Sequence, residues 1–351
     1  MYSRSLIIAA LISACLHHTS ALGQPPRRRG GGGNASLKQP YVGIKSQGKI
    51  EKDLFRIESN GVSTQPVVDA ARTLVDSLSK SQVFKIMFSV DDIEWCSWDN
   101  RHRYKRRGVG FDEMTDDQRM LAFNLMQVSL RAKGLKQFRD IMKLNGALAE
   151  LANDFEEYGE WLYWITIMGD PSADQPRGWQ IDGHYLVINY FVLGDQVVMS
   201  PVFVGSESVH ATSGKFQGTI VMQQEQNKGL AVLLSLTPEQ KKSAILSEVK
   251  QGNNALTQVY RDNANPDYVG APVADFTEPQ QILLLGLIHE YVGTMSDGHA
   301  AVKMNEVKKY LDHTWFAWIG GITDESVYYY RVHSPVVLIE FDHQRRVAPF
   351  R

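Results

Sequence analysis

The stretch Trp179–Val204 (WQIDGHYLVINYFVLGDQVVMSPVFV) constrains the fold of this chain more than any other. Two apolar runs, rich in aromatic and β-branched residues, flank the turn-forming pair Gly194-Asp195, a pattern that predicts a β-hairpin. Both faces of Tyr185–Leu193 are largely apolar, which predicts a strand covered on two sides rather than one lying at the surface. We therefore expect a sheet with other parts of the chain packed on both faces.

Helices are indicated by three starts that share one signature. Thr115, Thr237 and Thr277 are each followed three residues later by Gln, so a threonine hydroxyl can cap the first free amides while the glutamine reaches back. From these starts we expect helices near 116–132, 238–250 and 278–295. Further helices are expected at 62–79, 134–153, 219–235 and 298–312, and a short strand at 83–89.

The chain also contains two segments that align without a gap when Trp164 is placed on Trp315. The alignment then places Gly169 on Gly320, Trp179 on Tyr330, Val187 on Leu338, Ile188 on Ile339 and Tyr190 on Phe341. Either the chain holds an internal repeat, or two β-meanders resemble each other by chance. In the second copy the hairpin turn is replaced by Arg345-Arg346 and the sequence stops at Arg351, so we expect that hairpin to lack its last strand. Either its edge is exposed or the sequence is C-terminally shortened.

These patterns predict an α+β fold with helices packed on a mostly antiparallel sheet. Residues 46–351 form either a single domain or two similar helix-plus-β-meander halves, 60–205 and 206–351.

The N-terminus predicts export. An apolar run, Leu6–Leu16, follows Arg4 and is shorter than the about 20 residues that span a bilayer, which is typical of a signal peptide over residues 1–23. Cleavage after Gly23 would release a secreted or periplasmic chain starting at Gln24, without a transmembrane helix. The alternative is a lipobox ending at Cys15, which would anchor the protein by a lipid. Residues 24–45, rich in Pro, Arg and Gly at their start, are expected to be a flexible linker.

Charge and cysteine usage exclude two classes of protein. The formal net charge of −2 argues against a general nucleic-acid binder. The basic run Arg101–Arg107 is either an anion patch or, as we prefer, a solvated loop balanced by Asp91, Asp92, Glu94 and Asp99. With only two cysteines there is no disulfide framework.

Familiar catalytic motifs are absent from the sequence. His289-Glu290 suggests a zinc-protease helix, but that motif needs a second His where this chain has Gly293. There is no Gly-x-Ser-x-Gly elbow, phosphate loop or dinucleotide fingerprint.

The remaining candidates are polar residues that interrupt apolar strands. Asp182 and His184, two residues apart, would share one face of a strand, a spacing that suits an oriented general base, so we assign them as catalytic candidates. For a metal site we expect His184 to combine with residues of the second copy, because the repeat places Asp182 on His333; zinc, copper and iron suit such ligands. The predicted metal ligands are His184, His333, Glu340, Asp342 and His343. The alternative is that these histidines are hydrogen-bonded strand-end residues.

Arg177 and Arg331 could each bind a substrate carboxylate, or pair with Asp174 and Glu325.

Several segments resemble a family of exported, mostly bacterial proteins catalogued as domain of unknown function 3500. They are Arg107–Val109, the Thr115–Gln118 helix start, Tyr163–Pro171, Gly178–Asn189, Ser200–Gly205, Thr314–Gly320 and Tyr328–Gln344. The resemblance covers roughly residues 60–344 and implies a fold unit and an exported location, without an established activity. Family members often carry a second His where this chain has Tyr185, and tend to continue with a His-containing strand and a Gly/Asn/Asp-rich end, neither of which is present in this sequence.

Two functions are therefore expected. The first is an exported metal-dependent enzyme, hydrolytic or oxidative, that acts on an extracytoplasmic small molecule or polymer. The second is a non-catalytic exported protein that binds a glycan or cell-envelope ligand through exposed members of its aromatic clusters, Trp161/Tyr163/Trp164, Trp315/Trp318 and Tyr328–Tyr330.

Overall fold

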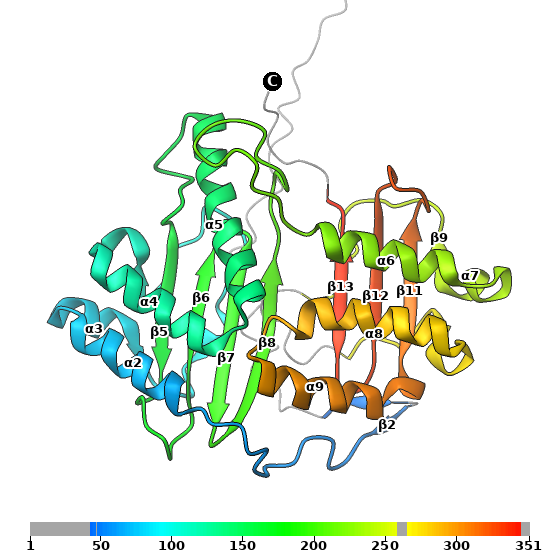
Figure 1. The fold of residues 1–351 in the computed structure, drawn as a ribbon, viewed down its shortest axis with the longest axis horizontal. Helices are drawn as coiled ribbons and strands as arrows, with labels where there is room; N and C mark the ends of the chain where they lie inside the picture. Colours follow the sequence, from blue (N-terminus) through cyan, green and yellow to red (C-terminus); the bar gives the residue numbers. More distant parts are fainter. Residues whose placement is uncertain (1–42, 47, 258–264, 345–351) are drawn as a thin grey trace, which may run out of the picture.

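The computed structural model describes residues 43–46, 48–257 and 265–344, and shows an α+β fold made of two similar halves (Figure 1). The predicted signal peptide, the lipobox and most of the linker lie outside the described residues, as do the residues after Gln344. The last linker residues lead into a small hairpin of β1 (Lys45–Ser46) and β2 (Lys49–Ile50).

The first half contains the helices α2–α5 and a sheet of six strands within the described residues, in the order β3-β5-β6-β7-β8 with β4 beside β5. Its elements are α2 (Gln65–Ser77), α3 (Lys80–Ile86), β3 (Met87–Phe88), η1 (Ile93–Cys96), β4 (Val109–Gly110), η2 (Phe111–Glu113), α4 (Asp116–Ser129), α5 (Ala132–Ala152), β5 (Tyr163–Met168), β6 (Arg177–Gly183), β7 (Leu186–Leu193) and β8 (Gln196–Val204).

The second half repeats this order, and its sheet of five described strands runs β10-β11-β12-β13 with β9 beside β11. Its elements are α6 (Gln223–Ser235), α7 (Pro238–Ala244), β9 (Ile245–Ser247), β10 (Ala271–Pro272), η3 (Val273–Asp275), α8 (Glu278–Val292), α9 (Asp297–Lys309), η4 (Leu311–His313), β11 (Trp315–Gly320), β12 (Tyr328–His333) and β13 (Leu338–Asp342). In Figure 1 the helices of both halves lie on the same side of their sheets.

Matching hydrogen bonds in the two halves confirm the internal repeat. The three predicted capping boxes are present, and a fourth begins at Ser79, so all four helices of this kind start in the same way. The glutamines of each pair of boxes also bond to one another. Gln82 pairs with Gln118, which donates to the carbonyl of Ser77, and Gln240 pairs with Gln280, which donates to the carbonyl of Ser235. We call each pair a glutamine clasp.

Glycines at matching places serve one purpose in both halves. Gly108 and Gly270 have φ of +95° and +105°, and a Cβ there would lie 2.4 Å from the carbonyl of Ile165 and 2.2 Å from that of Phe316. Both glycines therefore allow the chain entering β4 or β10 to approach closely the strand with which it pairs, β5 or β11.

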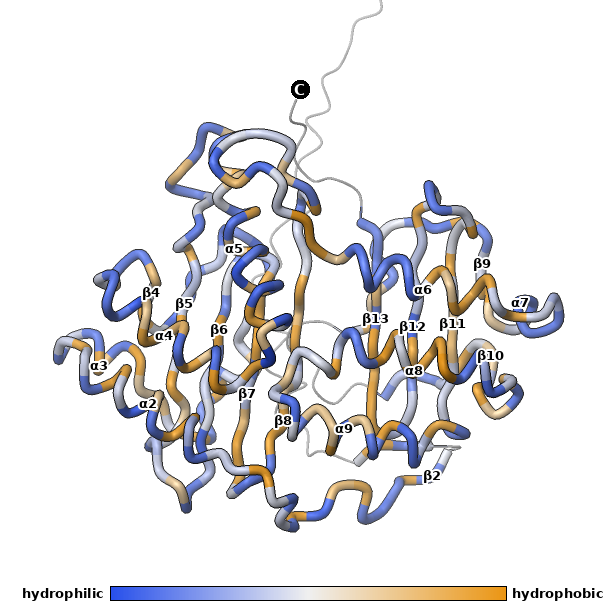
Figure 2. Tube along the Cα trace, in the orientation of Figure 1, coloured by the Kyte–Doolittle hydropathy of each residue, from blue (hydrophilic) through white to orange (hydrophobic). Residues whose placement is uncertain are grey.

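Two hydrophobic cores lie between helices and sheets, one in each half. Trp179 stacks on Tyr190 with ring centroids 5.2 Å apart, and Tyr330 stacks on Phe341 at 5.1 Å in the matching place. Val197 and Met199 of β8 contact both cores, so β8 lies where the halves meet. Figure 2 shows hydrophobic residues along β7 and β13.

Strand β7 is buried on both faces, as predicted. Helix α5 packs against β7 on one face, and on that side Trp179 of neighbouring β6 donates to Ser129 of α4. The loop between β3 and β4 covers the other, where Asn189 donates to the carbonyl of Trp95. The strand predicted at 83–89 is wrong for most of its length: α3 runs to Ile86, because the Ser79 capping box starts a helix, and only Met87–Phe88 are extended.

Candidate functional site

His184 lies in the tight turn between β6 and β7, rather than on a strand as its spacing from Asp182 suggested, because β6 ends at Gly183. Its Nδ1 is 2.8 Å from Oδ1 of Asn145 on α5. Since the Asn145 amide nitrogen donates to the carbonyl of Gly159 at 2.8 Å, its oxygen is the acceptor for His184. The imidazole therefore carries its proton on Nδ1 and a lone pair on Nε2. Burial, followed by the nearby charges of His102 and Arg106, lowers the pKa of His184 to about 3, so the ring is neutral at physiological pH.

A second imidazole, that of His102, contacts His184. The two ring centroids are 5.2 Å apart and the rings meet edge to face at 81°. Nε2 of His102 is 2.7 Å from a carboxylate oxygen of Glu157, which Arg103 also binds with both carboxylate distances at 2.6 Å. The hydrogen bonds from Arg103 lower the pKa of Glu157, so this carboxylate is ionised and orients the His102 ring. Tyr158 contacts both imidazoles.

A hollow of about 10 Å³ opens beside His184, room for about one water molecule. It is lined by α5 on one side and by Tyr185 and the segment Ser206–Ser208 on the other. Tyr185 has a φ of 60°, a left-handed backbone that is unusual for a bulky residue and that belongs to the two-residue turn between β6 and β7. The hollow can thus hold a water or one small group of a larger ligand.

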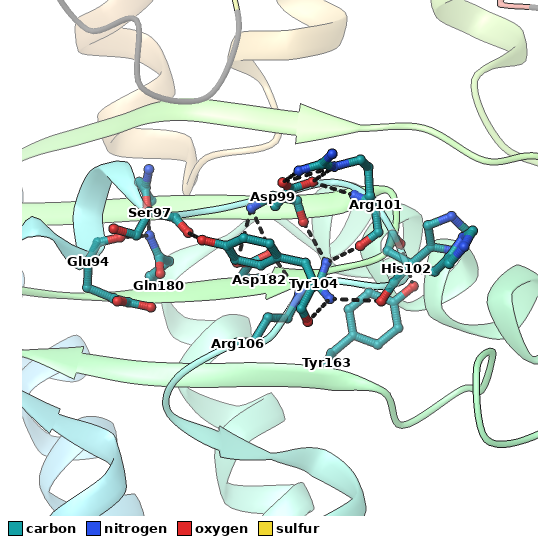
Figure 3. A network of polar contacts seen from close by, with 12 residues as sticks. Glu94, Ser97, Asp99, Arg101, His102, Tyr104, Arg106, Tyr163, Gln180 and Asp182 are labelled. Carbon is teal, nitrogen blue, oxygen red and sulfur yellow. Dashed lines mark hydrogen bonds and ion pairs between the residues drawn. The ribbon is translucent and has the colours of Figure 1, made fainter. Parts of the chain in front are cut away.

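Asp182 belongs to a neighbouring polar network, shown in Figure 3, and bonds there to Arg106 and Asp99 rather than to His184. The Asp182 and Arg106 side chains are 5% and 2% exposed, and the carboxylate oxygen lies 3.0 Å from Nε of Arg106. The other guanidinium nitrogens donate to four backbone carbonyls, those of Asp99, Arg101, His102 and Tyr104. The Arg106–Asp182 pair therefore holds the loop 99–106 over the sheet and places His102 against His184.

Burial raises the pKa of Asp182 to about 7, and Arg106 opposes that shift. Around it, most of the basic run pairs with acids; Asp92, Glu94 and Asp99 take part as expected, whereas Asp91 accepts from Ser89 instead, and Arg106 is buried rather than solvated. Arg101 pairs with Asp99, and Arg107 with Asp92 and Glu94. Arg103 and Arg106 use the more distant Glu157 and Asp182. The run is not an unpaired basic patch.

A family model described as "Protein of unknown function (DUF3500)" matches residues 60–351. The chain belongs to this family. The resemblance seen in the sequence is thereby confirmed. No curated protein and no solved structure matches the chain. The family description supplies no activity, so the function of this DUF3500 protein has to be argued from its residues.

The five predicted metal ligands do not come together in the structure. No three His, Cys, Asp or Glu side chains in the described residues could hold a metal ion. In the second half, Glu340 accepts from the amides of Leu256 and Thr257 and from Tyr329, while Asp342 binds Lys250 at 2.6 Å. Both carboxylates anchor the segment that covers their face of the sheet.

The two second-half histidines also have other neighbours. His333 stacks on Tyr268 with ring centroids 4.1 Å apart, and His343 lies between the amide of Tyr328 and the side chain of Gln226 on the helix side. The repeat does place Asp182 and His333 in matching positions, but in different sheets.

His102 is the neighbour of His184 that sequence reasoning missed, and the basic run Arg101–Arg107 gave no sign of the role of His102.

Within the described part of this DUF3500 protein, no helix has the length and apolar character needed to cross a membrane.

Proposed function

We propose that this DUF3500 protein is an exported enzyme that hydrolyses an extracytoplasmic substrate at the hollow beside His184. The observation that carries this proposal is the contact between two imidazoles at 5.2 Å, each oriented by its own oxygen partner. Nε2 of the neutral His184 carries a lone pair that can accept a hydrogen bond and orient a water, whereas its low pKa makes it a weak base. The His102–Glu157 pair beside it is the arrangement of an oriented acid–base group.

Export is supported by the apolar run Leu6–Leu16 and the small residues after it. The metal-dependent form of the proposal has weaker support. A neutral His184 suits zinc, copper or iron, but the described residues bring no second and third ligand of the predicted set to it.

The alternative, glycan or envelope binding by an aromatic face, is less well supported, because most of the aromatic clusters lie in the cores. Tyr163, Trp318, Tyr328 and Tyr330 are fully buried, and Trp161, Trp164 and Trp315 are half-buried. A stacking platform for sugars needs exposed ring faces, which these residues do not offer together.

The proposal is tested with the chain from Gln24 onward, purified and assayed against p-nitrophenyl acetate, p-nitrophenyl phosphate and p-nitrophenyl glucoside. We expect turnover of at least one of them, and a loss of about 10²–10⁴-fold in His184→Ala and His102→Ala, the range for an acid–base group. His313→Ala, at an exposed position, is the matched control and should keep full activity. Wild-type protein that turns over none of the three, or a His184→Ala variant as active as wild type, would overturn the proposal.

A further inference from the structure

One wall of the hollow beside His184 belongs to the loop that connects β8 to α6. The hollow is lined by α5 on one side and by Ser206–Ser208 of this loop on another. Its volume of about 10 Å³ holds one water molecule, whereas a bond to be hydrolysed carries larger groups on both sides. A substrate therefore cannot reach His184 in this arrangement unless one wall moves.

The loop 99–106, which places His102 against His184, is firmly fixed. The side chains of Arg106 and Asp182 are 2% and 5% exposed, and their pairing holds this loop on the sheet. Moving the loop would leave two buried charges without partners, which is strongly destabilising. Helix α5 and strands β6 and β7 contribute buried residues to the first core. The wall that can move is therefore the loop after β8.

The loop 205–219 is tied together by its own backbone hydrogen bonds. The amide of Ala211 donates to the carbonyl of Thr219, and the amide of Gly218 donates to the carbonyl of Ala211. Among residues 205–219 only Ala211 is buried, and Figure 1 shows the loop passing around the end of α5. A loop that buries little and bonds to itself can turn as one body without losing its internal contacts.

Two neighbouring side chains fasten this loop to α5 and to the segment after it. Phe216 packs so closely on Gly146 of α5 that a Cβ at Gly146 would lie 2.6 Å from the Phe216 ring. Lys215 pairs with Glu160 at 3.0 Å, and its amide donates to Glu150 at 3.1 Å. The Lys215 side chain is 66% exposed, and an ion pair in water contributes little to stability. These fastenings are weak beside the buried pair that holds the loop 99–106.

We propose that the loop 205–219 is a lid over the His184 hollow, held shut by Phe216 and Lys215, that swings outward to admit the substrate. Closure then shields the reacting groups from bulk water. The lid also accounts for a glycine in the interior of α5, because the Phe216 ring occupies the place where a side chain at Gly146 would lie. The inference rests on the proposed function for what enters the hollow, but the opening itself can be measured without turnover.

Diethyl pyrocarbonate, which acylates neutral imidazoles, reports the opening through the rate of modification of His184, followed by peptide mass spectrometry. We expect wild-type His184 to react more slowly than the exposed His313 of the same chain. Gly146→Ala puts a methyl group where Phe216 lies, and should raise the rate at His184 roughly tenfold, because the rate follows the population of a minor open state. Gly286→Ala is the matched control and should leave the rate unchanged, since it also lies inside a helix but its added methyl group meets open space in the described structure.

Lys215→Glu is an independent variant at an exposed position. It reverses the charge beside Glu150 and Glu160, so it should also speed the modification of His184 while the chain folds normally. Wild-type rates in both lid variants, or an equal rise in Gly286→Ala, would overturn the lid.

The lid and the proposed hydrolysis fail in different ways. Faster modification of His184 in both lid variants, without turnover of any p-nitrophenyl substrate, would support the lid and overturn the hydrolysis. Turnover with unchanged modification rates would support the hydrolysis and overturn the lid.

Discussion

The two halves of this DUF3500 protein share a backbone and differ in the polar groups that their sheets bury. Arg106 lies three residues before β4, and Tyr268 lies three residues before β10; these short strands pair with β5 and β11. Asp182 is the sixth residue of β6, and His333 is the sixth residue of β12. In the first half these positions form a buried ion pair, and in the second half a stacked pair of rings. The same fold therefore closes the same face with two unrelated kinds of contact.

The difference separates what maintains the fold from what can carry chemistry. The capping boxes, the glutamine clasps and the stacked core aromatics recur in both halves, so they belong to the architecture. The imidazole pair occurs in the first half alone among the described residues, since the place of His184 is taken by Pro335. Function is therefore expected to reside in the first half, with the second half as its structural counterpart.

The largest effect is expected from breaking the ion pair. Asp182→Ala leaves Arg106 buried without its carboxylate, which should cost about 3–5 kcal/mol in the free energy of unfolding and make the loop 99–106 sensitive to trypsin. His333→Ala removes a ring but leaves no buried charge, so its cost should be smaller. Urea unfolding of the two variants measures the difference.

A double variant separates charge from packing. Replacing Arg106 by Met together with Asp182→Leu removes both charges, and should recover most of the stability lost in Asp182→Ala. A double variant as unstable as the single one would show that the network contributes through its backbone contacts and not through the pairing of charges.

The next effect is a pH dependence common to both halves. Burial lowers the pKa of His184 to about 3 and that of His333 to about 4, below the value of about 6.5 in an unfolded chain. The unfolded chain therefore binds more protons below pH 6.5, and the stability contributed by each neutral ring is lost as the pH falls from about 6.5 towards its folded pKa. Each ring should account for up to roughly 2 kcal/mol of the loss between pH 6.5 and pH 5.

The variants His184→Gln and His333→Gln measure these two contributions as the difference from wild type in chemical unfolding at both pH values. The difference isolates each histidine from Asp182, whose raised pKa of about 7 acts in the opposite direction. A wild-type slope that neither substitution reduces would mean that the two rings are charged in the folded protein, and would contradict the burial argument.

Sequence reasoning succeeded where the signal is local and failed where it depends on the path of a loop. The Thr115 and Thr277 capping boxes are contained in four residues each, and both helices start where expected. The shared strand face predicted for Asp182 and His184 was wrong, because side chains alternate between faces only while the strand continues, and β6 ends at Gly183. His102 reaches His184 only because Arg106 closes its loop, a contact between residues far apart in sequence.

Two errors could have been avoided from the sequence itself. Glu340 and Asp342 share one face of a strand while His343 points to the other, so alternation alone argued against combining them with His343 in one metal site. The Ser79–Gln82 capping box was also readable, and it predicts the helix that replaces most of the strand expected at 83–89.

The smallest effect tests whether the repeated glutamine clasps are equivalent. Gln118→Ala and Gln280→Ala each remove half of a capping box and the amide pair to the partner glutamine, at a cost of about 1–2 kcal/mol. Gln280 is buried and Gln118 half-buried, so Gln280→Ala should lie at the upper end of that range. The clasps belong to different halves, so the double variant should show the sum of the two losses in urea unfolding. A clear departure from additivity would mean that the halves are coupled through their helices as well as through β8.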